Sequence, residues 1–311
     1  MLPTVDPAIL SALSLSPTST KLISTSSSSF TSTYKLTSTR DGLQISYFVK
    51  TAPGPAADAM FRGEHHSLNA IAAAVPFPFA PRSYAHGALQ HTNTGTGTSG
   101  GASGGQGAMG SYFLATDYID LGSSAPGGSG LTFAQKLAAM HNAPAPVPKG
   151  YDKPMYGFPV STCCGATAQD NEWCASWPEF YADRRLRSVL REGLRRQAPG
   201  GDRELQEMVE KVAGSVVPRL IGEGRVEEVR PVLVHGDLWS GNRGRGRIGG
   251  RGGAEEVVYD PSCVYGHSEY ELGIVRMFGG FGRDFWREYE ELVPRAEPKG
   301  EWEDRIALYE L

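Results

Sequence analysis

The residues best suited to chemistry in this sequence are a histidine, two aspartates and an asparagine in its last third. Segment 232–242 reads VLVHGDLWSGN, so His235 and Asp237 directly follow an apolar, β-prone run, and Asn242 lies five residues after Asp237. A second β-prone run, VVY at 257–259, ends at Asp260. An H-x-D-x-x-x-x-N segment followed by a strand and an aspartate is the order found in kinase catalytic loops, so this set predicts phosphoryl transfer.

The residue types fit the requirements of that reaction. Transfer of a phosphoryl group from ATP needs a carboxylate that accepts a hydroxyl proton, and it needs oxygen ligands that hold Mg²⁺ on the phosphates. Asp237 fits the first role, and Asn242 with Asp260 fits the second. His235 is predicted to orient the loop backbone, because Asp237 already occupies the position of the base. Asp, Asn and Gly are also common in turns, so the prediction depends on the ordered set rather than on any one residue.

A lysine and a glutamate upstream are candidates for holding the nucleotide. Lys50 ends an alternating β-prone run at 43–50, and Glu64 lies fourteen residues later in a stretch at 61–75 with helical spacing of its apolar residues. A strand lysine paired with a helix glutamate would hold the ammonium against the α- and β-phosphates. The alternative is that both side chains are simply exposed to solvent, which is their usual state.

Two backbone segments are expected to complete the nucleotide site. Segment 24–32 is rich in serine and has no glycine, although it occupies the position where kinases place a glycine-rich loop over the phosphates. Serines can still present backbone amides and hydroxyls to phosphate oxygens there, so the segment is the candidate phosphate clasp. Segment 115–122 is predicted to cross between two lobes, where backbone groups of Asp117, Tyr118 and Ile119 would meet the adenine edge.

The order of elements predicts an α+β, two-lobed, protein-kinase-like fold. Residues 21–119 should form a small N-terminal lobe built on an antiparallel sheet, with a hairpin turn at Arg40-Asp41-Gly42. Residues 120–311 should form a mainly helical C-terminal lobe, with helices at 131–141, 178–197 and 203–212. Residues 1–20 are expected to be a loose segment with a short helix at 7–13.

Two stretches look like insertions. Segment 94–110 contains eight glycines in seventeen residues, which predicts a flexible insertion in the small lobe. Segment 243–253 contains four arginines and six glycines and is interpreted as an inserted hairpin tip. An RNA contact of the RGG type is the alternative for the second stretch.

Several motifs together closely resemble the fructosamine kinase (ketosamine-3-kinase) family. They are GFPVSTCCG at 157–165, QDNEW at 169–173, HGDLWSGN at 235–242, YDP at 259–261, YGHSEYEL at 265–272 and FGGF at 278–281. The resemblance extends from about Lys21 to the end of the chain. This family is a branch of the small-molecule kinases that are similar to aminoglycoside phosphotransferases.

The resemblance implies an enzyme that uses ATP and Mg²⁺ to phosphorylate the 3-hydroxyl of ketosamines. The expected substrates are ribulosamine or fructosamine adducts on proteins, or the same sugars on free amines. Asp170, Asn171, Trp173 and Trp177 are candidates for the sugar pocket, because sugars are held by hydrogen-bonding groups and an aromatic face; packing in the core is the alternative for Trp177. His267 and Glu269 follow Asp260 and are candidates for bracing the active-site loop.

Composition is consistent with an ordinary soluble protein. The chain of 311 residues carries a formal net charge of −4, which gives no general case for binding nucleic acid or an anionic membrane. The N-terminus does not resemble a signal peptide or a membrane span. The sequence has four cysteines and no C-x-x-C pair, which favours free thiols in a reducing cytoplasm. We also expect the protein to be a monomer.

Two other functions remain open from the sequence. The serine-rich clasp and a chain that stops within a predicted helix are compatible with a catalytically inactive kinase fold that only binds its partners. A related phosphotransferase acting on an aminoglycoside, choline or homoserine is the third possibility, which the HGDLW and YGH motifs disfavour.

Overall fold

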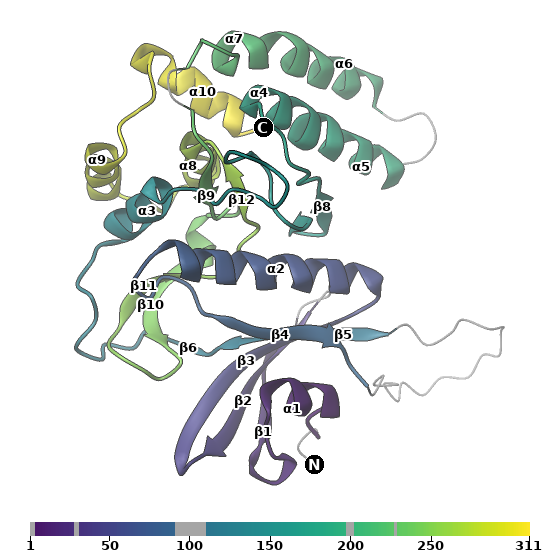
Figure 1. The fold of residues 1–311 in the computed structure, drawn as a ribbon, viewed down its shortest axis with the longest axis vertical. Helices are drawn as coiled ribbons and strands as arrows, with labels where there is room; N and C mark the ends of the chain where they lie inside the picture. Colours follow the sequence, from purple (N-terminus) through teal and green to yellow (C-terminus); the bar gives the residue numbers. More distant parts are fainter. Residues whose placement is uncertain (1–3, 28–30, 91–109, 197–201, 227–228) are drawn as a thin grey trace, which may run out of the picture.

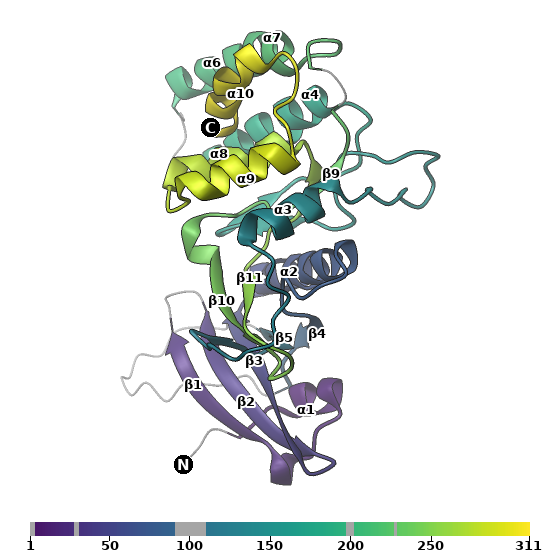
Figure 2. The same cartoon turned by 90° about the vertical axis from the view of Figure 1, so that its left-hand side faces the viewer.

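The computed structural model describes residues 4–27, 31–90, 110–196, 202–226 and 229–311. Residues 28–30 of the serine-rich segment lie outside the described residues, and so does the expected insertion at 94–110, except for Gly110. Figures 1 and 2 show a sheet at one end of the molecule and a helical part at the other. The expected α+β fold with an antiparallel sheet and a mainly helical second half is confirmed.

The sheet in the N-terminal half has five antiparallel strands in the order β1-β2-β3-β5-β4. They are β1 (Lys21–Ser27), β2 (Ser32–Arg40), β3 (Leu43–Pro53), β4 (Ser83–Ala88) and β5 (Ser111–Asp117). The predicted hairpin turn is present: Asp41 has φ 53° and Gly42 has φ 75°, as a type I′ turn requires. Residues 24–27 were expected to belong to a loop, and they instead continue β1 as a strand paired with β2.

A helix covers each face of this sheet (Figure 1). Helix α2 (Pro55–Ala74) lies between the sheet and the helical half, and α1 (Pro7–Leu13) packs on the opposite face. The short helix that we predicted at 7–13 is present with these bounds, whereas the rest of segment 4–20 is more ordered than the loose segment that we expected. The carboxylate of Asp6 caps α1, and Ile9, Leu13 and Leu15 are buried in one cluster with residues of β1, β2, β3 and β5, which gives this short helix a tertiary partner.

The C-terminal half contains most of the helices. They are α3 (Phe133–Asn142), α4 (Trp177–Glu179), which continues through a π-helical stretch (Phe180–Arg187) into α5 (Ser188–Arg196), α6 (Arg203–Lys211), α7 (Val217–Ile221), α8 (Ser268–Phe278), α9 (Arg283–Leu292) and α10 (Trp302–Tyr309). Short strand pairs connect them: β7 (Thr162–Cys164) with β8 (Thr167–Gln169), and β9 (Val232–Val234) with β12 (Val264–Gly266). None of the helices in the described ranges is long and apolar enough to cross a membrane.

The arginine–glycine segment is a strand rather than an inserted tip. Residues Arg243–Ile248 form β10, the central strand between β6 (Ile119–Leu121) and β11 (Glu255–Val258). The glycines make this pairing possible, because a Cβ on Gly246 would lie 2.8 Å from the carbonyl oxygen of Asp120. Only the turn after Ile248 matches the expectation of a hairpin tip.

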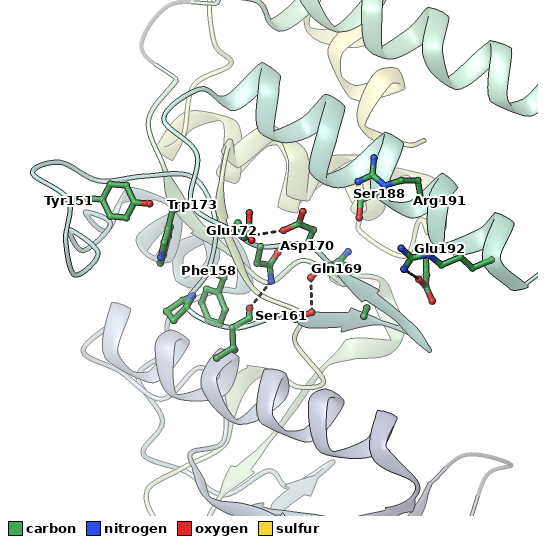
Figure 3. Close-up of a pocket in the computed structure, with 15 residues that line it drawn as sticks. Tyr151, Phe158, Ser161, Gln169, Asp170, Glu172, Trp173, Ser188, Arg191 and Glu192 are labelled. Carbon is green, nitrogen blue, oxygen red and sulfur yellow. Dashed lines mark hydrogen bonds and ion pairs between the residues drawn. The ribbon is translucent and has the colours of Figure 1, made fainter.

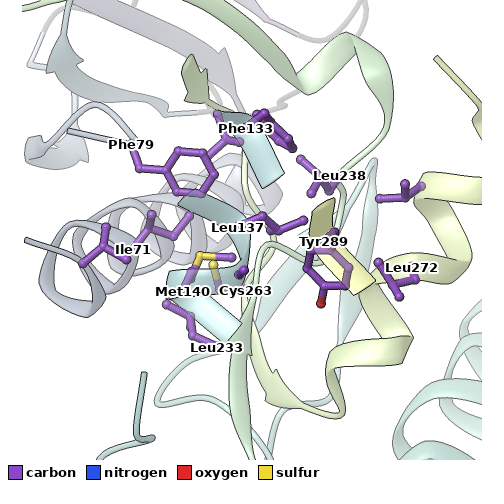
Figure 4. Packing of buried hydrophobic residues seen from close by; sticks show 14 of the residues in the cluster. Ile71, Phe79, Phe133, Leu137, Met140, Leu233, Leu238, Cys263, Leu272 and Tyr289 are labelled. Carbon is purple, nitrogen blue, oxygen red and sulfur yellow. The ribbon is translucent and has the colours of Figure 1, made fainter. Parts of the chain in front are cut away.

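The largest core cluster joins the two halves of the molecule (Figure 4). Leu68 and Ile71 of α2 pack in it together with Leu137 of α3, Leu233 of β9 and Leu272 of α8. Because α2 shares this core with the helical half, a division into two lobes near residue 119 remains a proposal. The four cysteines are free thiols, as expected.

Candidate active site

Lys50 connects the sheet to the helical half through two carboxylates. Its Nζ lies 2.8 Å from Oε1 and 2.9 Å from Oε2 of Glu64 on α2, and 2.7 Å from Oδ1 of Asp260. Burial alone would lower the pKa of Lys50, but the charges of Glu64 and Asp260 outweigh it and hold that pKa above its usual range. The two residues that we predicted to align ATP are therefore in contact, beside a predicted metal ligand.

Strand β9 delivers His235 and Asp237 to a tight loop. Gly236 has φ 79°, and a Cβ at this position would lie 2.1 Å from the carbonyl oxygen of Ser262, so only glycine fits here. The Ser262 N–H also donates to the carbonyl of His235 at 2.8 Å. Asn242 closes the loop, because its Nδ2 donates to the Asp237 carbonyl at 2.8 Å and to the Asp237 carboxylate at 3.1 Å.

His235 has the orienting role that the sequence suggested. Its side chain is fully buried, its Nδ1 accepts from the Asp237 N–H at 3.3 Å, and its Nε2 lies 3.0 Å from the Tyr259 carbonyl. Burial lowers the pKa of His235, so the ring is neutral, with its proton on Nε2. Both ring nitrogens are used to join the loop to the segment that carries Asp260.

Glu271 is a supporting residue that our sequence reasoning missed. Its carboxylate, at the start of α8, accepts the backbone N–H groups of His235 and of Gly236, the latter at 3.0 Å. Glu271 is only 1% exposed. Glutamate is usually exposed, so only its place within the YGHSEYEL motif pointed to this role.

The environment of Asp237 suits a general base. Burial raises the pKa of Asp237 to about 6; the hydrogen bond from Asn242 opposes this shift, and the negative charges of Glu271 and Asp260 add to it. A carboxylate with this pKa is largely ionised at neutral pH and still has useful basicity.

Asn242 and Asp260 can supply oxygen ligands to a Mg²⁺ ion. The Tyr259 N–H donates to the Asn242 carbonyl at 3.1 Å, which holds the two segments side by side. Asn242 Nδ2 donates its hydrogen bonds to Asp237, so the side-chain Oδ1 is the atom of Asn242 that can bind a metal ion. No group of three or more His, Cys, Asp or Glu side chains in the described ranges could hold a metal. This donor set fits Mg²⁺, which takes few protein ligands and completes its shell with phosphate oxygens and water.

The predicted adenine-binding segment is at the edge of the β11-β10-β6 sheet. Gly249 N–H donates to the Tyr118 carbonyl and Gly122 N–H to the Arg245 carbonyl, so these positions of the segment face β10. In an antiparallel pair alternate residues face the partner strand, so the N–H and C=O of Ile119 point away from β10. Ile119 therefore directs its backbone N–H and C=O to the side of β6 opposite β10.

The side chains of Asp117 and Tyr118 make contacts with other parts of the protein. The buried Asp117 carboxylate accepts from the Tyr84 hydroxyl at 2.8 Å and from the Arg82 N–H at 3.0 Å, which fixes the end of β5. The Tyr118 ring lies under Lys35, with 4.0 Å between Nζ and the ring centroid.

The four candidates for the sugar pocket have different surroundings. Asp170 forms an ion pair with Arg184 at 2.6 Å, and Trp173 is half-buried against Tyr265. Asn171 is buried, and its amide group is hydrogen bonded to other parts of the protein at both ends. Trp177 is 2% exposed and its Nε1 donates to Tyr309, so it belongs to the core.

His267 and Glu269 hold helix α10 rather than the catalytic loop. The carboxylate of Glu269 pairs with the fully buried Arg305 at 2.7 Å, and Nδ1 of His267 lies 3.0 Å from the Tyr309 hydroxyl. Glu271 performs the bracing that we expected of them.

Trp239 is a second residue that we did not single out. It lies two residues after Asp237, is 40% exposed, and its ring centroid is 6.0 Å from that of Phe278. The HGDLW motif, which contains this tryptophan, is the sequence feature that could have identified it.

The antiparallel sheet, the helical half and the side chains around Lys50 and Asp237 together are those of a protein with a protein-kinase-like fold. The model of the fructosamine kinase family matches residues 8–311. The chain therefore belongs to the fructosamine kinase family.

Relatives with known names are similar over much of the chain. A ketosamine-3-kinase from Mus musculus is 38% identical over 156 residues, which cover 50% of this chain and 45% of the relative. A chloroplastic protein-ribulosamine 3-kinase from Oryza sativa subsp. japonica is 34% identical over 268 residues, which cover 85% of this chain and 65% of the relative. The match thus spans about half to two thirds of the length of these relatives.

A solved structure from Thermobifida fusca, provisionally named a fructosamine-3-kinase, superposes with a TM-score of 0.60 at 27% identity. The superposition covers 93% of this chain and 83% of that one.

Proposed function

We propose that the protein transfers the γ-phosphoryl group of ATP to the 3-hydroxyl of a ketosamine, either free or attached to a protein amine. The observation that carries the proposal is the continuous set of contacts from Glu64 through Lys50 to Asp260, placed beside the hydrogen-bonded pair of Asp237 and Asn242. Family membership supports the choice of ketosamines as acceptors.

Each residue has a defined part in the step. Asp237 accepts the proton of the 3-hydroxyl while that oxygen attacks the γ-phosphorus, and the bond from this phosphorus to the bridging oxygen breaks and releases ADP. Lys50, held by Glu64, aligns the α- and β-phosphates, and Asn242 with Asp260 would hold Mg²⁺, which neutralises phosphate charge when bound. Positioning and charge neutralisation provide most of the acceleration.

The product explains why such a step would be useful. A phosphate on the carbon next to the ketone is a much better leaving group than hydroxide, so phosphate can be eliminated, and hydrolysis of the resulting imine by water then releases the free amine. We propose this repair of glycated amines as the role of the enzyme. Ribulosamines are the favoured substrates, because a shorter sugar makes fewer demands on the pocket, and the exposed ring of Trp239 offers it an aromatic face beside Asp237.

The test is an acceptor assay with purified protein, Mg²⁺ and ATP. Ribulosamine or fructosamine should be phosphorylated, and kanamycin, choline and homoserine should not. Transfer to another acceptor would keep the enzyme class and correct the substrate. A folded sample that binds no nucleotide, with or without Mg²⁺, would instead support an inactive kinase fold that serves as a binding protein.

A further inference from the structure

Two of the predicted sugar residues, Asp170 and Trp173, line a cavity of about 680 Å³ beside the β7–β8 hairpin (Figure 3). None of the predicted catalytic, metal-binding and lysine-pairing residues lines it; they are Lys50, Glu64, Asp237, Asn242 and Asp260. Asp170 and Glu172 pair with Arg184, and Glu192 pairs with Arg195. Together with Arg191, these arginines equal the carboxylates in number, so the cavity has no excess charge that would select a ligand.

His141 is a buried histidine in the last turn of α3, a helix that packs against β9. It is 1% exposed, and its Nδ1 lies 2.6 Å from the hydroxyl of Tyr289 on α9. Tyr289 is also 1% exposed and belongs to the core cluster (Figure 4). The reason for burying this polar pair next to the catalytic strand is found at the other nitrogen of the ring.

The second ring nitrogen of His141 faces the carboxylate that braces the catalytic loop. Its Nε2 lies 3.7 Å from Oε2 of Glu271, and both side chains are fully buried. This distance is longer than a hydrogen bond, and Nε2 has no hydrogen-bond partner among the described residues. A buried polar nitrogen without a partner costs free energy, and a buried carboxylate attracts an N–H group strongly because little water screens the two. A small approach of the two side chains therefore makes a hydrogen bond.

The tyrosine determines which nitrogen of His141 carries the proton. Burial and then the negative charges of Glu271 and Glu269 hold the pKa of Tyr289 well above its usual range, so the hydroxyl keeps its proton. When this hydroxyl donates to Nδ1, the proton of the neutral ring is on Nε2 and faces Glu271. The opposite tautomer would place the lone pair of Nε2 against a carboxylate, which is repulsive. Tyr289 therefore selects the form of His141 that can donate to Glu271.

Three N–H groups converge on Glu271. Its Oε2 accepts from the backbone N–H of His235 and faces Nε2 of His141, and its Oε1 accepts from the Gly236 N–H at 3.0 Å. The two backbone groups hold the carboxylate from the side of the loop, and His141 holds it from the side of α3. Because Asp237 directly follows Gly236, the orientation of Glu271 bears on where the carboxylate of Asp237 lies.

We propose that His141 is a positioning residue for the phosphoryl-transfer step. Supported by Tyr289, it holds the Glu271 carboxylate in the orientation that accepts both loop amides, and so fixes Asp237 against the acceptor hydroxyl. This inference rests on the proposed function and adds to it a residue that touches neither the nucleotide nor the acceptor. Such a residue acts on the chemical step and not on substrate binding, so its loss lowers kcat and leaves KM for ATP unchanged.

Two substitutions at position 141 separate positioning from packing. His141→Asn keeps an amide where Nδ1 lies, within reach of Tyr289, but has no atom that reaches Glu271. His141→Gln places its amide where Nε2 lies and can donate to Glu271. His141→Asn should lower kcat about 10- to 100-fold and change KM for ATP and for a ribulosamine less than about twofold, because Asp237 is misplaced and not removed. His141→Gln should restore kcat to within about threefold of wild type.

Asn142→Ala is the matched control. Asn142 is the next residue of α3, is exposed, and its Nδ2 donates to the Leu292 carbonyl at 3.2 Å, so the change removes a contact between α3 and the end of α9 without touching Glu271. Its kcat should stay within about twofold of wild type. Tyr289→Phe removes only the hydroxyl that fixes the ring of His141. It should lower kcat about three- to tenfold, and it provides the same test if His141→Asn does not fold.

Hydrogen exchange tests the inference without turnover. In the absence of ATP, His141→Asn should speed exchange of the His235 and Gly236 amides about tenfold, whereas the amides of the central strand β3 should exchange as in wild type. Equal kcat values for His141→Asn and His141→Gln, or unchanged exchange at both loop amides, would overturn the inference. If the wild-type protein phosphorylates no ketosamine, the proposed function is wrong, and the exchange rates still decide whether His141 holds the loop.

Discussion

Replacement of Gly63 by alanine tests whether the contact between α2 and the helical half positions the nucleotide-binding lysine. Gly63 precedes Glu64 on α2, and a Cβ at position 63 would lie 2.8 Å from the Ser161 carbonyl oxygen and 3.0 Å from the Thr162 Cα. Both atoms belong to the backbone, so neither can rotate away. The helix must move by several tenths of an ångström, and Glu64 must move with it.

The expected size of the effect follows from two opposing contributions. Alanine favours a helix by about 1 kcal/mol over glycine, whereas an overpacked contact costs about 1–3 kcal/mol. The net change should be a loss of stability of up to about 2 kcal/mol, or about 3 °C in melting temperature for a chain of 311 residues. The loss of activity should be larger, about 10- to 100-fold in kcat/KM for ATP, because a small displacement of Glu64 misplaces Lys50.

The matched control is Gly193→Ala in α5. A Cβ there would have no atom within 4 Å, so this variant should gain about 1 kcal/mol and keep full activity. Thermal melts and initial rates over a range of ATP concentrations measure both effects. If Gly63→Ala is as stable and as active as Gly193→Ala, the contact with residues 161 and 162 does not position Glu64, and our reasoning is refuted.

Three further predictions concern the catalytic loop. Asp237→Asn should lower kcat by about 10²- to 10⁴-fold and leave the Kd for ATP nearly unchanged; weaker nucleotide binding with normal turnover would contradict the role of base. Since burial raises the pKa of Asp237 to about 6 and the base must be ionised, kcat should rise with pH, reach half its maximum near pH 6 and fall about tenfold per unit below it; a flat profile from pH 5 to 8 would refute this. Glu271→Ala removes the acceptor for the N–H groups of His235 and Gly236 and should cost about 2–6 kcal/mol of stability in a denaturant titration, whereas a loss below 1 kcal/mol would show that water replaces the carboxylate.

Local sequence patterns determined the elements that carry the predicted catalytic groups. The alternation at 43–50 and the turn at Asp41-Gly42 predicted the β2–β3 hairpin, and helical spacing predicted α2 and α3, because each of these elements buries one face. The HGDLWSGN segment follows β9 as its apolar run predicted. These elements follow from short-range periodicity and turn chemistry, which are visible in a single sequence.

Other features depended on partners far apart in the chain. Segment 4–20 is ordered because Ile9, Leu13 and Leu15 meet the outer face of a sheet, and nothing in the segment itself shows that contact. The arginine–glycine segment became a strand because β6 and β11 lie on either side of it and its glycines admit their backbones. Its own composition resembles that of a loop.

The sequence by itself determined which residues could transfer a phosphoryl group: Asp237, Asn242, Asp260, Lys50 and Glu64 have the required chemistry in the required order. Only the tertiary structure decided what surrounds them. It buried Glu271 under the loop, placed Trp177 in the core, and put Asp170 and Trp173 on the wall of a cavity that Asp237 does not line. The physical reason is that side-chain chemistry and spacing are local properties, whereas burial and the distance between segments depend on how all the elements pack together.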